Sequence, residues 1–313
     1  MPLVSNMLLN YLLKIYMKIQ NMKVINYLLA GSLLFLMMNF SNANIYPTKE
    51  MISQNITTMD MNTTHQAWVT LTVSESKRVI AKGLKKYAPV AERLNRGQVI
   101  VTKGTTNTYF VEELINDTLA SGEYVLGHIL PEEVDIELDR SNTRQELVII
   151  NGEIQDITYS RALDGMNEGD IVIKGANIIN YKEGQAGVLI GSPTGGTTGV
   201  IMPKIKERGL RLIIPVGLEK ESSQDINQVD RYSKIPHETV GRNMPEIWSI
   251  KGELFTELEA IRQFADVDPV HISSGGIGGA EGAVTICIRG KQDEVAKALE
   301  IIRSVHGEPP FVR

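Results

Sequence analysis

Short apolar runs alternate with amphipathic segments through the middle of the chain. Three runs rich in Ile, Val and Leu predict buried strands at residues 98–103, 170–174 and 210–216. Three segments with apolar residues at helical spacing predict helices at residues 76–84, 108–119 and 201–208. Continuous apolar strands that alternate with helices are typical of parallel sheets covered on both faces. The pattern predicts the α/β class, with a doubly wound and mostly parallel sheet in a Rossmann-like domain over residues 66–220.

The end of the chain has a different order of elements. A helix at 252–264, an extended segment at 268–272, a strand at 283–288 and an amphipathic helix at 291–305 follow one another. Helix, strand, strand and helix are typical of a small α+β fold of ferredoxin-like style, which another segment can complete. We expect this smaller C-terminal domain over residues 248–313, after a polar linker or crossing loop at 221–247 that shows little periodicity.

Weaker patterns predict three further elements. Residues 67–73 alternate between polar and apolar positions, as a strand or an extended lead-in does. Residues 124–130 have the composition of a strand. Asn151-Gly152 lies between apolar segments within 147–158, and this pair favours the tight type I′ turn of a β-hairpin.

Residues 1–43 resemble a targeting segment rather than part of a fold. Lys23 precedes an apolar stretch at 24–38, and small residues follow as far as Ala43, as in a secretory signal cleaved after Ala43. The stretch is about 15 residues long, short of the roughly 20 that span a membrane. We expect an exported or periplasmic protein with no stable membrane span in its mature form, and a disordered lead-in at 44–65. Met22 is a natural start codon, which suggests that residues 1–21 are a misplaced gene start. The alternatives to export are a plain membrane anchor, spurious upstream translation, or a cytoplasmic protein.

Composition narrows the classes of function. Hydrophobic residues make up 42% of the chain and charged residues 22%, which excludes disorder over the whole length. The net charge of -5 argues against nucleic acid as a main partner, because proteins that grip phosphate backbones are usually basic. The five histidines are scattered, and Cys287 is the one cysteine, so we expect neither a metal site nor a disulfide. We expect no cofactor, and we leave a homo-oligomer open.

Two loops rich in glycine and threonine are candidates for holding an anion. The first follows the strand at 98–103 and consists of Lys103, Gly104, Thr105, Thr106 and Asn107. The second precedes the helix at 201–208 and includes Thr194, Gly195, Gly196, Thr197 and Thr198. A loop of this kind at the start of a helix points backbone N–H groups and hydroxyls at negative charge. In a doubly wound sheet both loops lie at the carboxyl ends of strands, where ligands usually bind. The alternative is that both are ordinary tight turns.

Four segments in this order resemble the ribose-5-phosphate isomerase and CoA-transferase superfamily, including methylthioribose-1-phosphate isomerase and the regulatory subunits of the related initiation factor. They are Lys103–Asn107, the turn within Ile173–Asn180, the glycine loop Gly191–Gly199 and the strand with its continuation Ile213–Lys220. The resemblance covers residues from about 68 to 220. It implies the α/β fold and a pocket for a small phosphorylated or carboxylated ligand.

The resemblance also contains a departure that bears on catalysis. The sugar-phosphate isomerases have a Gly-Ala-Asp turn whose carboxylate transfers protons, and here Gly175 and Ala176 precede Asn177. An asparagine amide has no useful pKa and cannot act as a general base. The remaining candidate catalytic residues are Lys174 and Glu183, although Glu183 lies in no motif of the family.

The residues leave three classes of function open. One is a divergent isomerase- or transferase-like enzyme. The second is a ligand-binding or regulatory protein that has lost the catalytic carboxylate, a reading that Asn177 favours. The third is a structural or interaction domain without a ligand.

Overall fold

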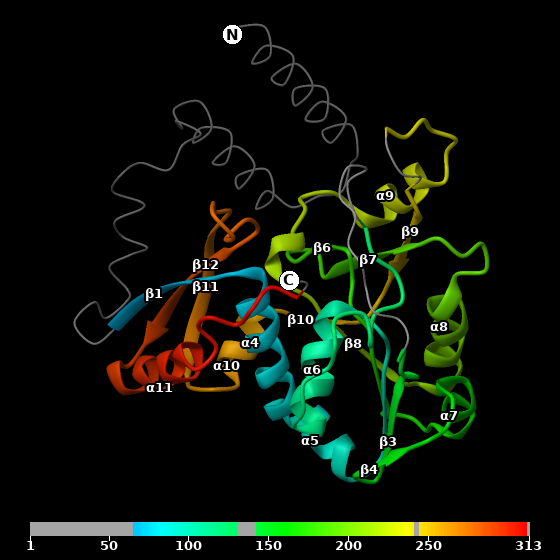
Figure 1. Ribbon diagram of the computed structural model, residues 1–313, viewed down its shortest axis with the longest axis horizontal. Helices are drawn as coiled ribbons and strands as arrows, with labels where there is room; N and C mark the ends of the chain where they lie inside the picture. The colour runs from blue at the N-terminus through cyan, green and yellow to red at the C-terminus, as the bar shows by residue number, and fades with distance from the viewer. Residues whose placement is uncertain (1–64, 130–141, 241–243, 312–313) are drawn as a thin grey trace, which may run out of the picture. The chain divides into compact units, whose positions relative to one another are not determined.

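The computed structural model describes residues 65–129, 142–240 and 244–311 (Figure 1). The chain divides into two units, residues 1–62 and 63–313, and all described residues belong to the second. The signal-like segment at 1–43 lies outside the described residues, as does the lead-in at 44–65 except for its last residue.

A mixed six-stranded sheet forms the centre of this unit, which confirms the α/β class. Its strand order is β10-β8-β5-β2-β3-β4. Four neighbouring strands run parallel: β10 (Glu253–Phe255), β8 (Arg211–Pro215), β5 (Ile171–Ile173) and β2 (Gln98–Val101). Two antiparallel strands complete it: β3 (Leu147–Ile150) and β4 (Glu153–Gln155).

The central strands are buried on both faces because helices lie on both sides of the sheet (Figure 1). On one side are α4 (Val73–Lys86), α5 (Ala88–Asn95) and α6 (Thr105–Ile115). On the other side are α7 (Tyr159–Gly165) and α8 (Gly196–Arg208). Each fully buried Val or Ile of β2 and β5 contributes about 1.5–3 kcal/mol through the hydrophobic effect, so this sheet anchors the loops at its edges.

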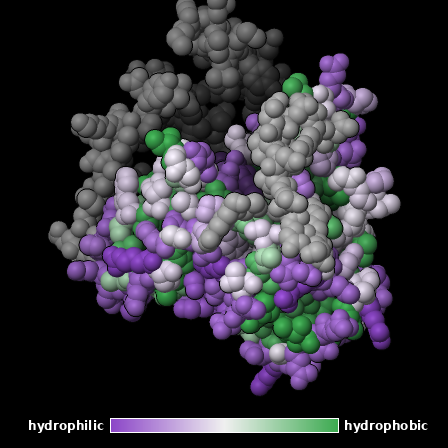
Figure 2. Space-filling model, in the orientation of Figure 1, coloured by the Kyte–Doolittle hydropathy of each residue, from purple (hydrophilic) through white to green (hydrophobic). Residues whose placement is uncertain are grey.

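The hairpin expected from Asn151-Gly152 is present and extends the sheet. Both residues have positive φ, 50° and 88°, as a type I′ turn requires. Strand β3 pairs antiparallel with β2, so the hairpin belongs to the same sheet as the parallel strands. Figure 2 shows hydrophobic surface gathered near β3, and Ile154 of the edge strand β4 is 58% exposed.

The strand expected at 124–130 is absent from its described part, residues 124–129. Tyr124 instead fixes this segment against the sheet. Its hydroxyl donates to the Val101 carbonyl and accepts from the Leu147 N–H, and its own carbonyl accepts from the Gly104 N–H. The segment thereby crosses the carboxyl end of β2 rather than adding a strand.

A small antiparallel sheet lies at the carboxyl end of the parallel strands (Figure 1). Its order is β6 (Ile178–Asn180), β7 (Gln185–Ile190) and β9 (Glu246–Ile250). Helix α9 (Ile226–Ser233) packs against β9. The stretch 221–247, expected as a linker without periodicity, thus contains a helix and the beginning of β9.

A third sheet joins the two ends of the described chain. Strand β12 (Val284–Gly290) lies between β1 (His65–Leu71) and β11 (Val267–Ser274), antiparallel to both. Helix α10 (Glu257–Arg262) precedes β11, and α11 (Gln292–Arg303) follows β12. The segment that completes the expected helix–strand–strand–helix unit is therefore β1.

Strand pairing crosses the expected boundary between 66–220 and 248–313 in both directions. β1 pairs with a strand from the C-terminal part, and β10 pairs with β8 of the large sheet. The first part of the segment 252–264, expected to be helical, forms β10. Helix α10 starts only at Glu257, after the N-cap Thr256, which forms a capping box with Glu259. Among the described residues, none of the helices has the length and apolar character needed to cross a bilayer.

Candidate functional site

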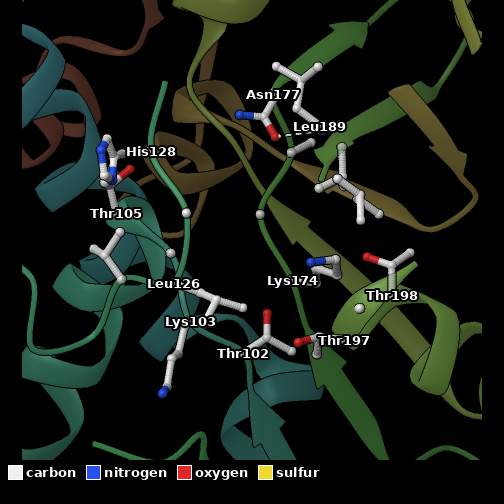
Figure 3. A pocket seen from close by; sticks show the side chains of 18 of the residues that line it. Thr102, Lys103, Thr105, Leu126, His128, Lys174, Asn177, Leu189, Thr197 and Thr198 are labelled. Carbon is white, nitrogen blue, oxygen red and sulfur yellow. Dashed lines mark hydrogen bonds between the residues drawn. The ribbon is translucent and has the colours of Figure 1, made fainter. Parts of the chain in front are cut away.

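A cavity of about 700 Å³ lies at the carboxyl ends of β2 and β5 (Figure 3). Its wall is made by the loop between β2 and α6, the turn after β5, the end of β7 and the start of α8. Residues 125–129 close another part of it, with Lys220, Pro245 and Phe311 from more distant segments. Both glycine–threonine loops therefore contribute to one cavity.

The side chain of Asn107 fastens the first loop to the central strands. This side chain is fully buried, and its Nδ2 donates to the Thr102 carbonyl at 2.7 Å. The Thr102 N–H in turn donates to the carbonyl of Ile173 in β5, at 2.9 Å. Asn107 Oδ1 has no hydrogen-bond partner within the described residues. Asn107 thus ties the start of α6 to both central strands, and it lines the cavity with Lys103, Gly104, Thr105 and Thr106.

The second loop depends on glycines at positions that no other residue fits. Gly195 has a φ of 80°, and an added Cβ would lie 2.7 Å from the ring of Trp248. An added Cβ on Gly199 would lie 2.1 Å from the Thr194 carbonyl oxygen. This close packing brings Gly196, Thr197 and Thr198 to the cavity at the start of α8, whose N-cap forms no side-chain hydrogen bond.

Thr194 and Glu183, two candidates from the sequence, lie outside the lining. The Thr194 side chain is exposed and hydrogen-bonds to the Ser192 hydroxyl at 3.1 Å. Glu183 is exposed in the turn between β6 and β7.

Asn177 lines the cavity, and its oxygen is already engaged by the backbone. The Leu189 N–H donates to Asn177 Oδ1 at 3.0 Å, and the Asn177 N–H donates to the Gly187 carbonyl at 2.8 Å (Figure 3). The residue fastens β7 beside the turn after β5. A neutral amide supplies this acceptor without placing a charge in the cavity.

Lys174 is the most unusual group in the cavity. It directly follows β5, its residue is 8% exposed, and its ammonium forms no hydrogen bond or ion pair with any described residue. Burial lowers the pKa of Lys174 to about 8, against an opposing effect of the Glu146 carboxylate. Figure 3 shows its nitrogen directed into the cavity, with the Thr198 hydroxyl pointing toward it and the Thr197 hydroxyl pointing toward Thr102.

The described lining of the cavity carries positive charge. Its described lining contains Lys103, Lys174 and Lys220, together with His128, and no Asp or Glu. The Lys103 side chain extends away from the Lys174 nitrogen in Figure 3, so the two lysines do not converge on one point. Gly175 and Ala176 complete the turn beside Lys174.

Sequence reasoning missed several residues of the lining. Thr102 belongs to a continuous apolar run, where it resembles an ordinary strand residue. His128, Lys220 and Phe311 come from segments distant in sequence, and no local pattern marks them. They reach the cavity only because the folded sheets bring those segments together.

A cluster of buried ionisable side chains adjoins this wall and was also missed. Glu257 is fully buried, and burial together with the Glu219 carboxylate raises its pKa to about 7. It accepts a hydrogen bond from the Leu218 N–H at 3.0 Å. Burial and the charge of Lys220 lower the pKa of Lys77 to about 8. Lys220 lies 3.5 Å from Glu219 and also lines the cavity, so it connects the cluster to the site.

Within the described ranges, no group of three His, Cys, Asp or Glu side chains is arranged to hold a metal ion. Comparison of the chain with protein-family models, with curated proteins and with solved structures gave no match.

Proposed function

We propose that the cavity binds a small anionic metabolite, phosphorylated or carboxylated. The observation that carries this proposal is the buried ammonium of Lys174, which forms no hydrogen bond or ion pair with a described residue and interacts with the Glu146 carboxylate only at longer range. An isolated buried charge is costly, and it is tolerated where a partner or ligand compensates it. An anionic group in the cavity would supply that compensation.

The starts of α6 and α8 support the same ligand charge. The first N–H groups of a helix lack intrahelical acceptors, and the helix dipole makes this end attractive to anions. Neither helix has a side-chain hydrogen bond at its N-cap, and residues of both first turns line the cavity. Thr105, Thr106, Thr197 and Thr198 add hydroxyl donors at the same ends.

The resemblance to ribose-5-phosphate isomerases and CoA transferases is part of this proposal. So are the doubly wound fold of residues 66–220 and the ferredoxin-like fold of residues 248–313. It is supported by the loop after β2 and the turn after β5, which both border the cavity. A reaction through an aspartate or glutamate has no residue in the described lining. We therefore favour ligand binding, by a non-catalytic ligand-binding or regulatory protein, over catalysis by a carboxylate.

A thermal-shift screen tests the binding proposal. Inorganic phosphate, ribose 5-phosphate, pyruvate and a CoA ester are suitable probes. A probe at 100 times its dissociation constant stabilises the folded protein by about 2.7 kcal/mol. We expect Lys174→Met to abolish the shift and the exposed Lys182→Met to preserve it. Absence of a shift with every probe, or an equal shift in Lys174→Met, would overturn the proposal.

An enzyme remains the second candidate, because Lys174 combines a lowered pKa with access to the cavity. Isomerase-type chemistry removes a proton from a carbon beside a carbonyl group. A probe that binds is incubated with the protein in deuterated water and followed by NMR. Deuterium incorporation that Lys174→Met abolishes supports an enzyme, and no incorporation supports a binding protein.

We also propose that residues 1–43 direct export, with cleavage after Ala43. Mass spectrometry of the mature N-terminus tests this, because a native chain that retains residues 22–43 would be cytoplasmic or anchored. A homo-oligomer is a separate proposal that sedimentation analysis can decide.

A further inference from the structure

Resting on the proposed function, we propose that Lys174 is the covalent partner of the ligand. Its side-chain amine forms an imine with the carbonyl carbon of an anionic aldehyde or ketone bound in the cavity.

The position of Lys174 is fixed by the most buried part of the sheet. β5 lies between β2 and β8, and the Lys174 N–H continues the ladder by donating to the Ile213 carbonyl at 3.0 Å. The side chain leaves this rigid point and directs its nitrogen into the cavity (Figure 3). A nucleophile held in this way has a defined direction of approach toward a bound carbonyl group.

The surroundings of Lys174 increase the fraction of neutral amine, which is the form that attacks a carbonyl. Burial lowers its pKa to about 8, and Glu146 is the carboxylate that acts in the opposite direction. Among the described residues, the other titratable groups on the cavity wall are Lys103, His128 and Lys220. At pH 7 about one amine in ten would be neutral, roughly 300-fold more than for a lysine of ordinary pKa.

The proposed step is balanced without an oxidant or a reductant. The lone pair of Lys174 Nζ forms a C–N bond while the carbonyl π electrons move to oxygen, and a proton transferred from nitrogen to that oxygen gives a carbinolamine. The nitrogen lone pair then expels the hydroxyl group, and loss of the second nitrogen proton leaves the imine and one water. The Thr198 hydroxyl points toward the same space and can donate a hydrogen bond to the departing oxygen (Figure 3).

Different parts of the cavity wall contact the two groups of such a ligand. The N-termini of α6 and α8 attract the anionic group, and Lys174 attacks the carbonyl carbon. A sugar phosphate in its open-chain form and a short oxo acid both carry these two groups. The shared chemistry is a carbonyl group connected to a phosphate or a carboxylate.

Borohydride trapping tests the inference in the full-length protein. Pyridoxal 5′-phosphate and glyoxylate serve as a phosphorylated and a carboxylated aldehyde, and reduction converts each imine into a stable amine that peptide mass spectrometry locates. We expect Lys174 to be labelled at least tenfold faster than the exposed Lys182 at pH 7. Inorganic phosphate should slow labelling at Lys174 and leave Lys182 unchanged. The faster of the two probes identifies the preferred anionic group.

Two controls separate this inference from the binding proposal. Lys174→Arg keeps the positive charge without a nucleophilic amine, so it should retain the thermal shift with phosphate and lose the trapped adduct. 5′-Deoxypyridoxal, which lacks the phosphate, should label Lys174 at least tenfold more slowly than pyridoxal 5′-phosphate.

Each contrary result has a distinct meaning. A phosphate shift in the wild-type protein with no preferential labelling of Lys174 by either aldehyde would overturn the imine and leave the anion site standing. Equal labelling by 5′-deoxypyridoxal would overturn the requirement for an anionic ligand. Absence of both the shift and the adduct would overturn the two proposals together.

Discussion

Replacing Lys174 with methionine should make the ligand-free protein more stable. The change removes a buried charge that forms no hydrogen bond or ion pair with a described residue, and it retains an unbranched side chain of similar length. The lowering of the Lys174 pKa from 10.5 to about 8 corresponds to a penalty of about 3 kcal/mol at pH 7, at about 1.4 kcal/mol per pKa unit. We expect Lys174→Met to recover about 1–3 kcal/mol of the free energy of unfolding.

The pH dependence gives this prediction a specific signature. Between pH 8 and 10.5 the unfolded chain retains a proton on Lys174 that the folded protein has lost, so the stability of the wild-type protein rises with pH over this interval. The penalty is complete below pH 8 and disappears above 10.5. The advantage of Lys174→Met should therefore be greatest at pH 7 and small at pH 10.5.

Urea unfolding of the wild-type and variant proteins at the two pH values measures the difference. The comparison cancels other groups that titrate over the same range, Lys77 among them. Lys182→Met, at an exposed turn, is the control and should change stability little at either pH. A Lys174→Met protein that is less stable at pH 7, or whose advantage persists unchanged at pH 10.5, would refute the account of Lys174 as a buried charge without a direct partner among the described residues.

Four other changes test the site and the fold. Asn177→Ala leaves the Leu189 N–H without its acceptor and should lower the free energy of unfolding in urea by about 1 kcal/mol. Asn177→Asp should keep this hydrogen bond. Equal losses of stability in the two variants would contradict the role of Asn177 as the acceptor. Gly199→Ala places a Cβ against the Thr194 carbonyl and should abolish phosphate binding in calorimetry. Gly165→Ala, whose Cβ would meet only ordinary contacts away from the cavity lining, should preserve it. Because the pKa of Glu257 is raised, the free energy of unfolding falls as pH rises from 4.5 to about 7. Glu257→Gln should flatten this fall when urea unfolding is compared between pH 5 and 8. An unchanged slope would show that the Glu257 carboxyl does not titrate in this range. A chain that begins at residue 73 lacks β1 and should lose the ordered NMR signals of β12, which a chain beginning at residue 63 should retain.

The elements predicted correctly are those that a few neighbouring residues in the sequence determine. The pair Asn151-Gly152 accepts positive φ at low cost, so the hairpin could be located from two residues. The apolar runs at β2, β5 and β8 are short and continuous because both faces of these strands are covered. The glycine–threonine loops follow from the same reasoning, since they lie beside those strands.

The errors lie where tertiary pairing decides the structure. Glu253–Phe255 continues the apolar spacing of the following helix, yet it forms β10 because β8 offers a parallel partner. Residues 124–129 have the composition of a strand, but Tyr124 uses its hydrogen bonds to cross the end of β2. The sequence could place Lys174 beside a loop, but its lack of a direct hydrogen-bond or ion-pair partner among the described residues depends on the side chains that fold around it.

The pairing of β1 with β12 has a consequence for synthesis of the chain. Thr70 and Thr285, which hydrogen-bond across the two strands, are 215 positions apart. During translation β1 leaves the ribosome early, and its partner is made only after nearly all other elements have emerged. Until then an unpaired strand edge is open to other chains, so we expect nascent copies to depend on chaperones more than the finished protein does.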